Sequence, residues 1–261
     1  KNLGNLSRLG FDTETVSLAP LDWQRLMRHA FINYGNPLVP TESALYTSVP
    51  KKAMDYGIRL ILWGDNPALQ LGDLGTLGQD PYDGDNISNT NTLRNNGVSW
   101  IKDLIPPAVN TDGYFYPGRD LYVEKQLKTV YMGTVMKDWS LLNNNVYAVV
   151  RGVDNRQERP ELIGDIYGVT AVDQQITPVN QVIKYLKYGF GRMTDYANEL
   201  IRQDKMTRET AIDLVKRYDG RLSKGYFKHL CKYLEMTYEE FWDVIDGFAN
   251  KELFERISVD E

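Results

Sequence analysis

The spacing of hydrophobic residues divides this chain into two parts that meet near residue 175. In the first part, apolar residues recur at helical spacing over 21–32 and again over 44–56, where Pro50 is expected to kink or break the second helix. Gly57 follows as a C-terminal cap signal. Residues 58–63 are then apolar almost without interruption, which is typical of a strand covered on both faces, as in a parallel sheet. A helix, a glycine and a buried strand form half of a βαβ unit, so the pattern predicts an α/β domain.

Further elements of the same kind follow up to residue 150. The pattern predicts a helix over 91–104 that is stopped by two prolines, a strand over 130–136 and a helix over 140–150. A short β-branched run lies at 15–19, residues 151–175 are irregular, and 72–91 form a loop rich in Gly, Asp and Asn. A loop of that length in a compact domain is usually functional or mobile.

From residue 177 onward, the sequence predicts one helix after another. Thr177 followed by Pro178 is typical of an N-cap with proline at the first helical position. Thr237 and Glu240 have the spacing of a capping box, the clearest helix start in the chain. The remaining helices are expected to begin at Thr194, Thr207 and Ser223, and Gly189 and Gly220 to end the first and third. We therefore expect an α/β domain over 1–175 and a small helical domain over 176–261.

Composition and charge narrow the classes of function. The chain has 261 residues with a formal net charge of −5, one Cys and two His. A single Cys allows no internal disulfide, which favours a reducing, cytoplasmic compartment, and three Cys and His residues are too few for an all-Cys/His zinc site. We expect Cys231 to be a buried thiol and His229 to lie at the surface. The acidic balance argues against nucleic acid as a partner, and the mean hydropathy of −0.43, with no apolar run near 20 residues, argues against a membrane protein.

The first candidate site is the end of the predicted strand at 58–63. In open α/β sheets, ligands bind beyond the carboxyl ends of the strands. Trp63 and Gly64 stand there, and Asp65 and Asn66 add a carboxylate and an amide. An Asx turn that merely leaves the strand is the alternative interpretation.

The second candidate site is the turn between the first two C-terminal helices. Gly189 and Gly191 flank an aromatic residue, and Arg192 follows at a helix start, an arrangement that suits a phosphate or carboxylate. A helix–helix corner with a surface ion pair is the alternative. The segment is not a GxGxxG dinucleotide fingerprint, because its glycines leave a helix and not a strand. The residues of this candidate wall are Tyr188, Gly189, Phe190, Gly191, Arg192 and Asp195.

These stretches carry a resemblance to a known family. IKYLKYGFGRMTDYANELIRQDKMTRETAIDLVKRYDG and the later YLEMTYEEFWDVIDGF resemble the C-terminal signature of the N-acetyl sugar amidotransferases, PP-loop ATPases of surface-polysaccharide and nonulosonic acid biosynthesis. LILWGDNPAL is similar to that family's strand ending in W-G-E-N-P-A, with Asp65 in place of the commoner Glu. IKDLIPP and, loosely, VYMGTVMKDWS fit in the same order. The resemblance implies a Rossmann-like PP-loop (adenine nucleotide alpha hydrolase-like) parallel sheet before the helical domain.

The resemblance also implies a reaction. The family converts an acetamido group on a nucleotide-activated sugar into an acetamidino group, in lipopolysaccharide, O-antigen or nonulosonic acid biosynthesis. The cofactors would be ATP and Mg²⁺, and ammonia would come from glutaminase and cyclase-like partner subunits. Asp65 and Asn66 would act in catalysis. Trp63, Gly64 and the candidate wall would touch the nucleotide or the substrate, with Arg192 on a phosphate and Lys184 and Lys187 in lesser roles. The helical domain would bring that wall over the strand end.

Two departures keep other functions open. The family's S-G-G-x-D-S pyrophosphate loop does not occur in the 261 residues, so we expect it, with the first strand, upstream of Lys1. The Cys pair that many relatives carry after their G-[ND]-P position is absent from NPLVPTESALY, which argues against a metal or Fe–S role there. The alternatives are another PP-loop adenylating enzyme that modifies RNA, and a non-catalytic scaffold derived from the family.

Overall fold

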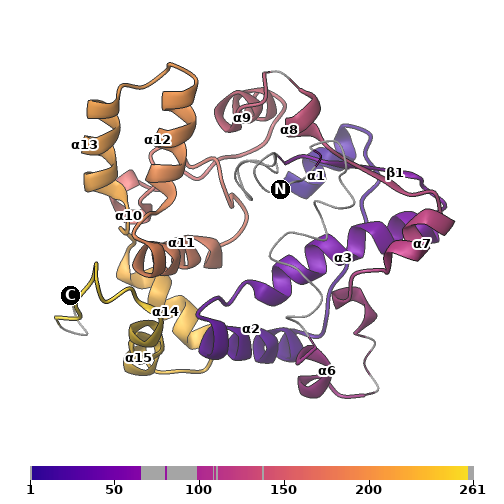
Figure 1. Ribbon diagram of the computed structural model, residues 1–261, viewed down its shortest axis with the longest axis horizontal. Coiled ribbons are helices and arrows are strands. Elements are labelled where there is room, and N and C mark those ends of the chain that lie inside the picture. Colours follow the sequence, from indigo (N-terminus) through magenta and orange to yellow (C-terminus); the bar gives the residue numbers. More distant parts are fainter. Residues whose placement is uncertain are drawn as a thin grey trace. The chain divides into compact units, whose positions relative to one another are not determined.

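The chain forms two compact units in the computed structural model, which describes residues 2–65, 80, 99–107, 109, 111–136 and 138–257 (Figure 1). One unit comprises residues 14–26 and 39–144, and the other comprises 1–13, 27–38 and 145–261. Helix α2 (Pro20–Tyr34) begins in the former and ends in the latter. The two units are described separately below as the sheet unit and the helical unit.

The sheet unit is built around one long helix and a small parallel sheet. Helix α3 (Val39–Asp55) runs through Pro50 without a break. Strand β1 (Leu60–Trp63) pairs in parallel with β2 (Lys128–Tyr131), with Leu60 opposite Lys128 and Trp63 opposite Tyr131. A parallel pair needs a crossover connection, so the α/β class is confirmed. The described elements between the strands are α6 (Ile101–Leu104), the 3₁₀ helix η2 (Asp112–Tyr114) and α7 (Arg119–Glu124).

Two expectations about the strands are wrong. The run at 58–63 suggested burial on both faces, but only Ile61 is buried, while Leu60 and Leu62 are 53% and 59% exposed. Side chains alternate across a strand, and Ile61 packs in a core cluster with Ala53 of α3 on one face only. The second strand ends at Tyr131, where Met132–Val135 form the one-turn helix α8 instead of a longer strand.

Several sequence predictions of helices are confirmed within the described residues. The helix expected over 21–32 is α2, that over 44–56 is α3, and that over 140–150 is α9 (Leu141–Val149). Residues 15–19 have no regular structure. The loop over 72–91 and most of the helix over 91–104 lie outside the described residues, apart from Asp80 and α6.

The helical unit contains the C-terminal helices that the sequence predicted. They follow α1 (Asn2–Arg8) and the short α10 (Pro160–Ile163), and α12 and α13 lie side by side (Figure 1). The second half of α2 packs among them, since the rings of Phe31 and Phe241 stack with centroids 4.8 Å apart. The five helices are α11 (Ile176–Tyr188), α12 (Arg192–Arg202), α13 (Arg208–Tyr218), α14 (Lys224–Tyr233) and α15 (Tyr238–Phe248).

The predicted helix starts are confirmed in part. Thr207 caps α13 through its side chain, and Thr237 and Glu240 form the capping box of α15. Ser223 is the N-cap of α14 but makes no side-chain cap bond. Thr177 and Thr194 are not N-caps, because α11 already begins at Ile176 and α12 at Arg192. No helix among the described residues is long and apolar enough to cross a membrane.

Candidate functional site

The end of β1 places Trp63, Gly64 and Asp65 in the sheet unit. The ring of Trp63 lies against Tyr46 of α3, with centroids 5.0 Å apart. The chain then bends, and the carbonyl of Asp65 accepts a hydrogen bond from the backbone N–H of Gly133 at 2.9 Å. That bond joins the segment after β1 to α8, which follows β2. The carboxyl ends of the two parallel strands therefore lie at one edge of the sheet. Asn66 lies outside the described residues.

The turn from α11 to α12 lies in the helical unit and is called the α11–α12 corner below, comprising residues 188–195. Gly189 ends α11 in the left-handed region, with φ 80°, and its N–H donates to the carbonyl of Tyr185. A Cβ at Gly189 would also lie 2.7 Å from a methyl carbon of Leu253. The left-handed backbone conformation favours glycine there, whereas the exposed Leu253 side chain could move aside.

Asp219, the C-cap of α13, holds the start of α12. Its carboxylate accepts from the backbone N–H groups of Gly191 at 2.9 Å, Met193 at 2.8 Å and Thr194 at 3.2 Å, and from the Thr194 hydroxyl at 2.5 Å. The first N–H groups of a helix lack partners within the helix, so Asp219 acts as an N-cap supplied from another helix. A Cβ at Gly191 would lie 2.9 Å from Asp219 Oδ1, so the second glycine makes room for this carboxylate.

Two cations of the corner share one carboxylate. Asp195 Oδ2 lies 2.7 Å from Lys184 Nζ and 3.5 Å from Arg192 Nη1. The ammonium of Lys184 also lies 4.5 Å from the ring centroid of Phe190, a cation–π distance. These three side chains together carry one excess positive charge, and the carboxylate of Asp219 lies at the same helix start.

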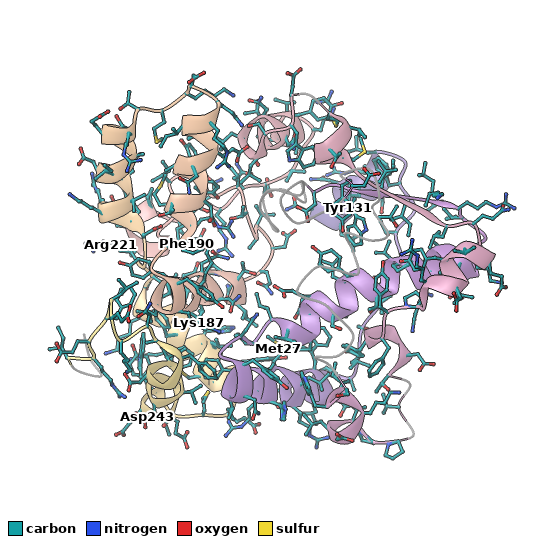
Figure 2. All side chains as sticks on the ribbon, viewed as in Figure 1. Met27, Tyr131, Lys187, Phe190, Arg221 and Asp243 are labelled. Carbon is teal, nitrogen blue, oxygen red and sulfur yellow. The ribbon has the colours of Figure 1, made fainter. Side chains whose placement is uncertain are left out.

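Lys187 adds a third cation on the same side of α11. Its ammonium donates to the carbonyl of Tyr34 at 3.0 Å and lies 5.2 Å from the ring of Phe248. Burial lowers the pKa of Lys187. Figure 2 labels Lys187 and Phe190 near the end of α11, and the residues Tyr188 and Phe190 are 60% and 41% exposed. Exposed aromatic rings beside cations are a surface on which bases can stack.

The inner side of Arg192 faces a polar region of the helical unit. Its Nε is buried and has no hydrogen-bond partner among the described residues, and its guanidinium carbon lies 5.9 Å from the ring of Tyr196. Tyr196 in turn donates to Asp165 at 3.0 Å, and burial is the main cause that raises the pKa of Tyr196. Arg192 and Asp165 line a cavity of about 20 Å³. That volume suits about one water molecule, so a phosphate could reach Arg192 only from the outer side.

The structure thus brings together the predicted wall residues within one unit and adds two that the sequence reasoning missed or ranked low. Lys184 is closer to Asp195 than Arg192 is. Asp219 was missed altogether, because a cap supplied by a residue more than 20 positions away leaves no local sequence signal. Among the described residues, no group of three or more His, Cys, Asp or Glu side chains is arranged to hold a metal ion.

A model of a known protein family matches the helical part of the chain. Residues 165–260 match the family model described as the C-terminal domain of WbpG-like lipopolysaccharide (LPS) biosynthesis proteins. The matched segment contains the whole α11–α12 corner, together with Lys184, Asp219 and Leu253. No curated protein matches the chain. The match therefore supports a role in LPS biosynthesis.

Proposed function

We propose that the chain belongs to an ATP-dependent N-acetyl sugar amidotransferase of LPS biosynthesis. The observation that carries this proposal is the match of residues 165–260 to the WbpG-like C-terminal domain. The amidotransferase signature that the sequence resembles lies largely in the same segment. The two parallel strands, with Trp63–Asp65 where β1 ends, are compatible with a Rossmann-like PP-loop sheet.

The chemistry replaces an amide oxygen, which is a very poor leaving group. In the proposed reaction, the acetamido oxygen attacks the α-phosphorus of ATP, and the bond to pyrophosphate breaks. Ammonia then adds to the carbon of the resulting O-adenylyl imidate, AMP leaves, and an acetamidino group remains after loss of a proton. We propose cytoplasmic glutaminase and cyclase-like subunits as the ammonia source.

The corner is proposed to bind a phosphate of the activated sugar or of ATP. Since the N–H groups at the start of α12 already donate to Asp219, a phosphate would instead replace Asp195 as the partner of Arg192 and Lys184. Bidentate pairing suits the guanidinium of Arg192 for this role. Tyr188 and Phe190 are proposed to contact the nucleotide, with Gly189 and Gly191 shaping the turn.

The strand end is proposed to carry the reacting groups. Asp65 and Asn66 would act on the acetamido group, with Trp63 and Gly64 lining the same place. Mg²⁺ would accompany ATP, and no described residue cluster provides a cage for it, so no step is assigned to a protein-held metal.

A pyrophosphate-release assay tests the proposal. The full-length protein would be given ATP, ammonia and nucleotide-linked diacetamido sugars, and we expect pyrophosphate release that requires both the sugar and ammonia. Arg192→Ala should lower kcat/KM at least tenfold, about 1.4 kcal/mol, because it removes the phosphate partner. Arg202→Ala is the matched control, since Arg202 is an exposed residue in the last turn of the same helix.

The result decides between the proposal and its rivals. Unchanged kinetics in Arg192→Ala would refute the role of that residue. Sugar binding without any pyrophosphate release would favour the non-catalytic scaffold. Release that depends on RNA and not on a sugar would favour an RNA-modifying enzyme.

A further inference from the structure

Glu42 lies on the face of α3 that packs against β1. One turn later on this face stands Tyr46, whose ring lies against Trp63. Two turns further along, Ala53 packs in a core cluster with Ile61. Side chains three, four or seven residues apart on a helix share one face, so Glu42 belongs to the side of α3 that faces the sheet.

The direction of α3 carries Glu42 past the carboxyl end of β1. Between Ala53 and Tyr46, the contact of the helix with the strand moves towards Trp63, the last residue of β1, so helix and strand run antiparallel. From Tyr46 back to Glu42 the helix axis advances by about 6 Å. At that level β1 has ended, and the chain continues into 64–65 of the strand-end candidate site. Glu42 was not among the residues that the sequence predicted for this site.

The carboxylate of Glu42 makes no hydrogen bond or ion pair with the described residues. The 3₁₀ helix η2 packs on the neighbouring face of α3, where the hydroxyl groups of Ser43 and Thr47 donate to its carbonyls. Glu42 itself is half-buried, so it is shielded from water but still within reach of a ligand. Burial raises its pKa from 4.5 to about 7.

No charged group of the elements that pack against Glu42 accounts for this pKa. The elements that pack closely on α3 are η2 and β1, and their titratable groups are Asp112 and Tyr114 of η2 and Asp65 after β1. The carbonyl of Asp112 accepts from Lys51, which is more than two turns from Glu42 along α3. Burial is the one cause of the raised pKa of Glu42.

A role in the helix alone does not explain Glu42. An acidic residue in the first turn of a helix often stabilises the helix dipole. That role favours the charged form and lowers the pKa of the carboxyl group, whereas the pKa of Glu42 is raised. A carboxyl group held at the end of a strand where ionisation is unfavourable is typical of a site of proton transfer.

We propose that Glu42 is a catalytic residue of the strand-end site that takes a proton from the nitrogen of the incoming ammonia. This role rests on the amidotransferase function proposed above. The lone pair of ammonia forms a bond to the carbon of the O-adenylyl imidate, which leaves a positive charge on the nitrogen. One N–H bond then breaks, its electron pair stays on the nitrogen, and the carboxylate of Glu42 gains an O–H bond. That electron pair forms the C=N bond as the C–O bond to AMP breaks, and Glu42 returns its proton to water.

The reaction needs a base at this point. A nitrogen that keeps its positive charge is a better leaving group than AMP, so without proton transfer the adduct reverts to ammonia. A general base works best when its pKa is near the pH of the reaction, and Glu42, with a pKa of about 7, meets this condition. General acid–base catalysis typically contributes about 10²–10⁴-fold to a rate.

Two measurements on the full-length protein separate this role from adenylylation. Exchange of labelled pyrophosphate into ATP, with the nucleotide-linked diacetamido sugar and no ammonia, reports adenylylation alone, whereas amidine formation reports the whole reaction. Glu42→Gln should keep the exchange rate within about twofold of the wild type and lower ammonia-dependent amidine formation at least about 100-fold. Glu42→Asp keeps a carboxylate and should be at least about tenfold faster than Glu42→Gln.

Hydroxylamine in place of ammonia gives a readout that a merely structural role would not change. The nitrogen of its adduct is more acidic and gives its proton to water more readily, so Glu42→Gln should lose less than about tenfold with hydroxylamine. In the wild type, kcat/KM for free ammonia should rise with pH through about 7, because the base must be deprotonated, and Glu42→Gln should lack this rise. Glu124→Gln is the matched control and should behave like the wild type, since Glu124 is an exposed residue of α7, which precedes β2.

The outcomes are distinct. Wild-type protein without sugar-dependent exchange would refute the amidotransferase reaction and this role with it. Normal exchange with unchanged amidine formation in Glu42→Gln would overturn the role of Glu42 alone, as would equal losses of both activities or equal losses with ammonia and hydroxylamine. Folding does not obscure the result, because removal of a carboxylate that is buried at a free-energy cost should leave Glu42→Gln at least as stable as the wild type at pH 8.

Discussion

Replacing Asp219 should unfold the start of α12 and loosen the α11–α12 corner. Its carboxylate accepts four hydrogen bonds, three from backbone N–H groups and one from the Thr194 hydroxyl. Hydrogen bonds to a charged group contribute about 1.5–3 kcal/mol each. Four such bonds would sum to about 6–12 kcal/mol, a sum that overestimates the effect because Asp219 is only half-buried and the bonds are not additive. We expect Asp219→Ala to lower the free energy of unfolding by about 2–4 kcal/mol.

Asp219→Asn removes the negative charge but keeps nearly the same side-chain shape. The amide keeps one oxygen that can accept, but its NH₂ group faces N–H donors that it cannot satisfy. We expect a loss of about 1–3 kcal/mol, smaller than that of Asp219→Ala. Urea denaturation at pH 7 followed by circular dichroism measures both losses. Asp213→Asn is the matched control, because Asp213 is an exposed residue of α13, and it should change stability by less than about 0.5 kcal/mol.

An anion should rescue Asp219→Ala. Without the carboxylate, the N–H groups of Gly191, Met193 and Thr194 form an unoccupied helix N-terminus beside Arg192, which is an anion-binding arrangement. Inorganic phosphate should therefore raise the Tm of Asp219→Ala more than that of the wild type. A loss below about 0.5 kcal/mol in Asp219→Ala, or an equal response of both proteins to phosphate, would refute the role of Asp219 as a remote cap.

Three further predictions concern stability and reactivity. Thr237→Ala should cost about 1 kcal/mol by removing the capping box of α15, whereas Ser223→Ala should cost less, because Ser223 makes no side-chain cap bond; thermal unfolding compares the two. Burial raises the pKa of Glu42 from 4.5 to about 7, so between these pH values the folded chain keeps a proton that the unfolded chain releases. The free energy of unfolding therefore falls as pH rises from about 4.5 to 7. Glu42→Gln should exceed the wild type in free energy of unfolding by about 3 kcal/mol at pH 8 and by nothing at pH 4 in urea titrations. Burial raises the pKa of the Cys231 thiol to about 11, so a thiol reagent at pH 8 should label it only in denaturant, and rapid labelling of folded protein would contradict its burial.

The elements with local signals were predicted well. The capping box at Thr237, the cap at Thr207 and the left-handed Gly189 each depend on residues within one helical turn, and each is confirmed. Signals of this kind are contained in a few neighbouring residues, so a single sequence is sufficient to find them.

The features that failed depend on contacts between distant residues. The apolar run at 58–63 suggested two buried faces, but burial depends on which elements cover the sheet, and Leu60 and Leu62 remain exposed. Thr194 has the sequence of an N-cap, yet the N–H groups at the start of α12 donate to Asp219, and the N-cap is Gly191, three residues earlier. Nothing in the sequence around Thr194 indicates that the remote Asp219, and not Thr194, accepts from these N–H groups.

The glycines of the corner show why composition alone left its role open. A phosphate-binding turn and a helix–helix corner can both use two glycines. In this structure Gly189 has a left-handed backbone conformation that ends α11, and Gly191 leaves room for the carboxylate of Asp219. The glycines therefore make the corner compact and do not themselves indicate a ligand. What remains for binding is the side-chain cluster, in which Lys184 and Arg192 face one carboxylate.

The helical unit also extends beyond the segment that matches the WbpG-like C-terminal domain. The match begins at residue 165, but the second half of α2 belongs to the same compact unit. Phe31 is fully buried and stacks on Phe241, and Arg28 donates to the carbonyl of Glu235 at 2.6 Å. Lys187 of the corner side of α11 donates to Tyr34, in the last turn of α2. Residues 27–38 thus hold both the core of α15 and a cation next to the corner, so the geometry of the corner depends on a helix that is distant from it in sequence.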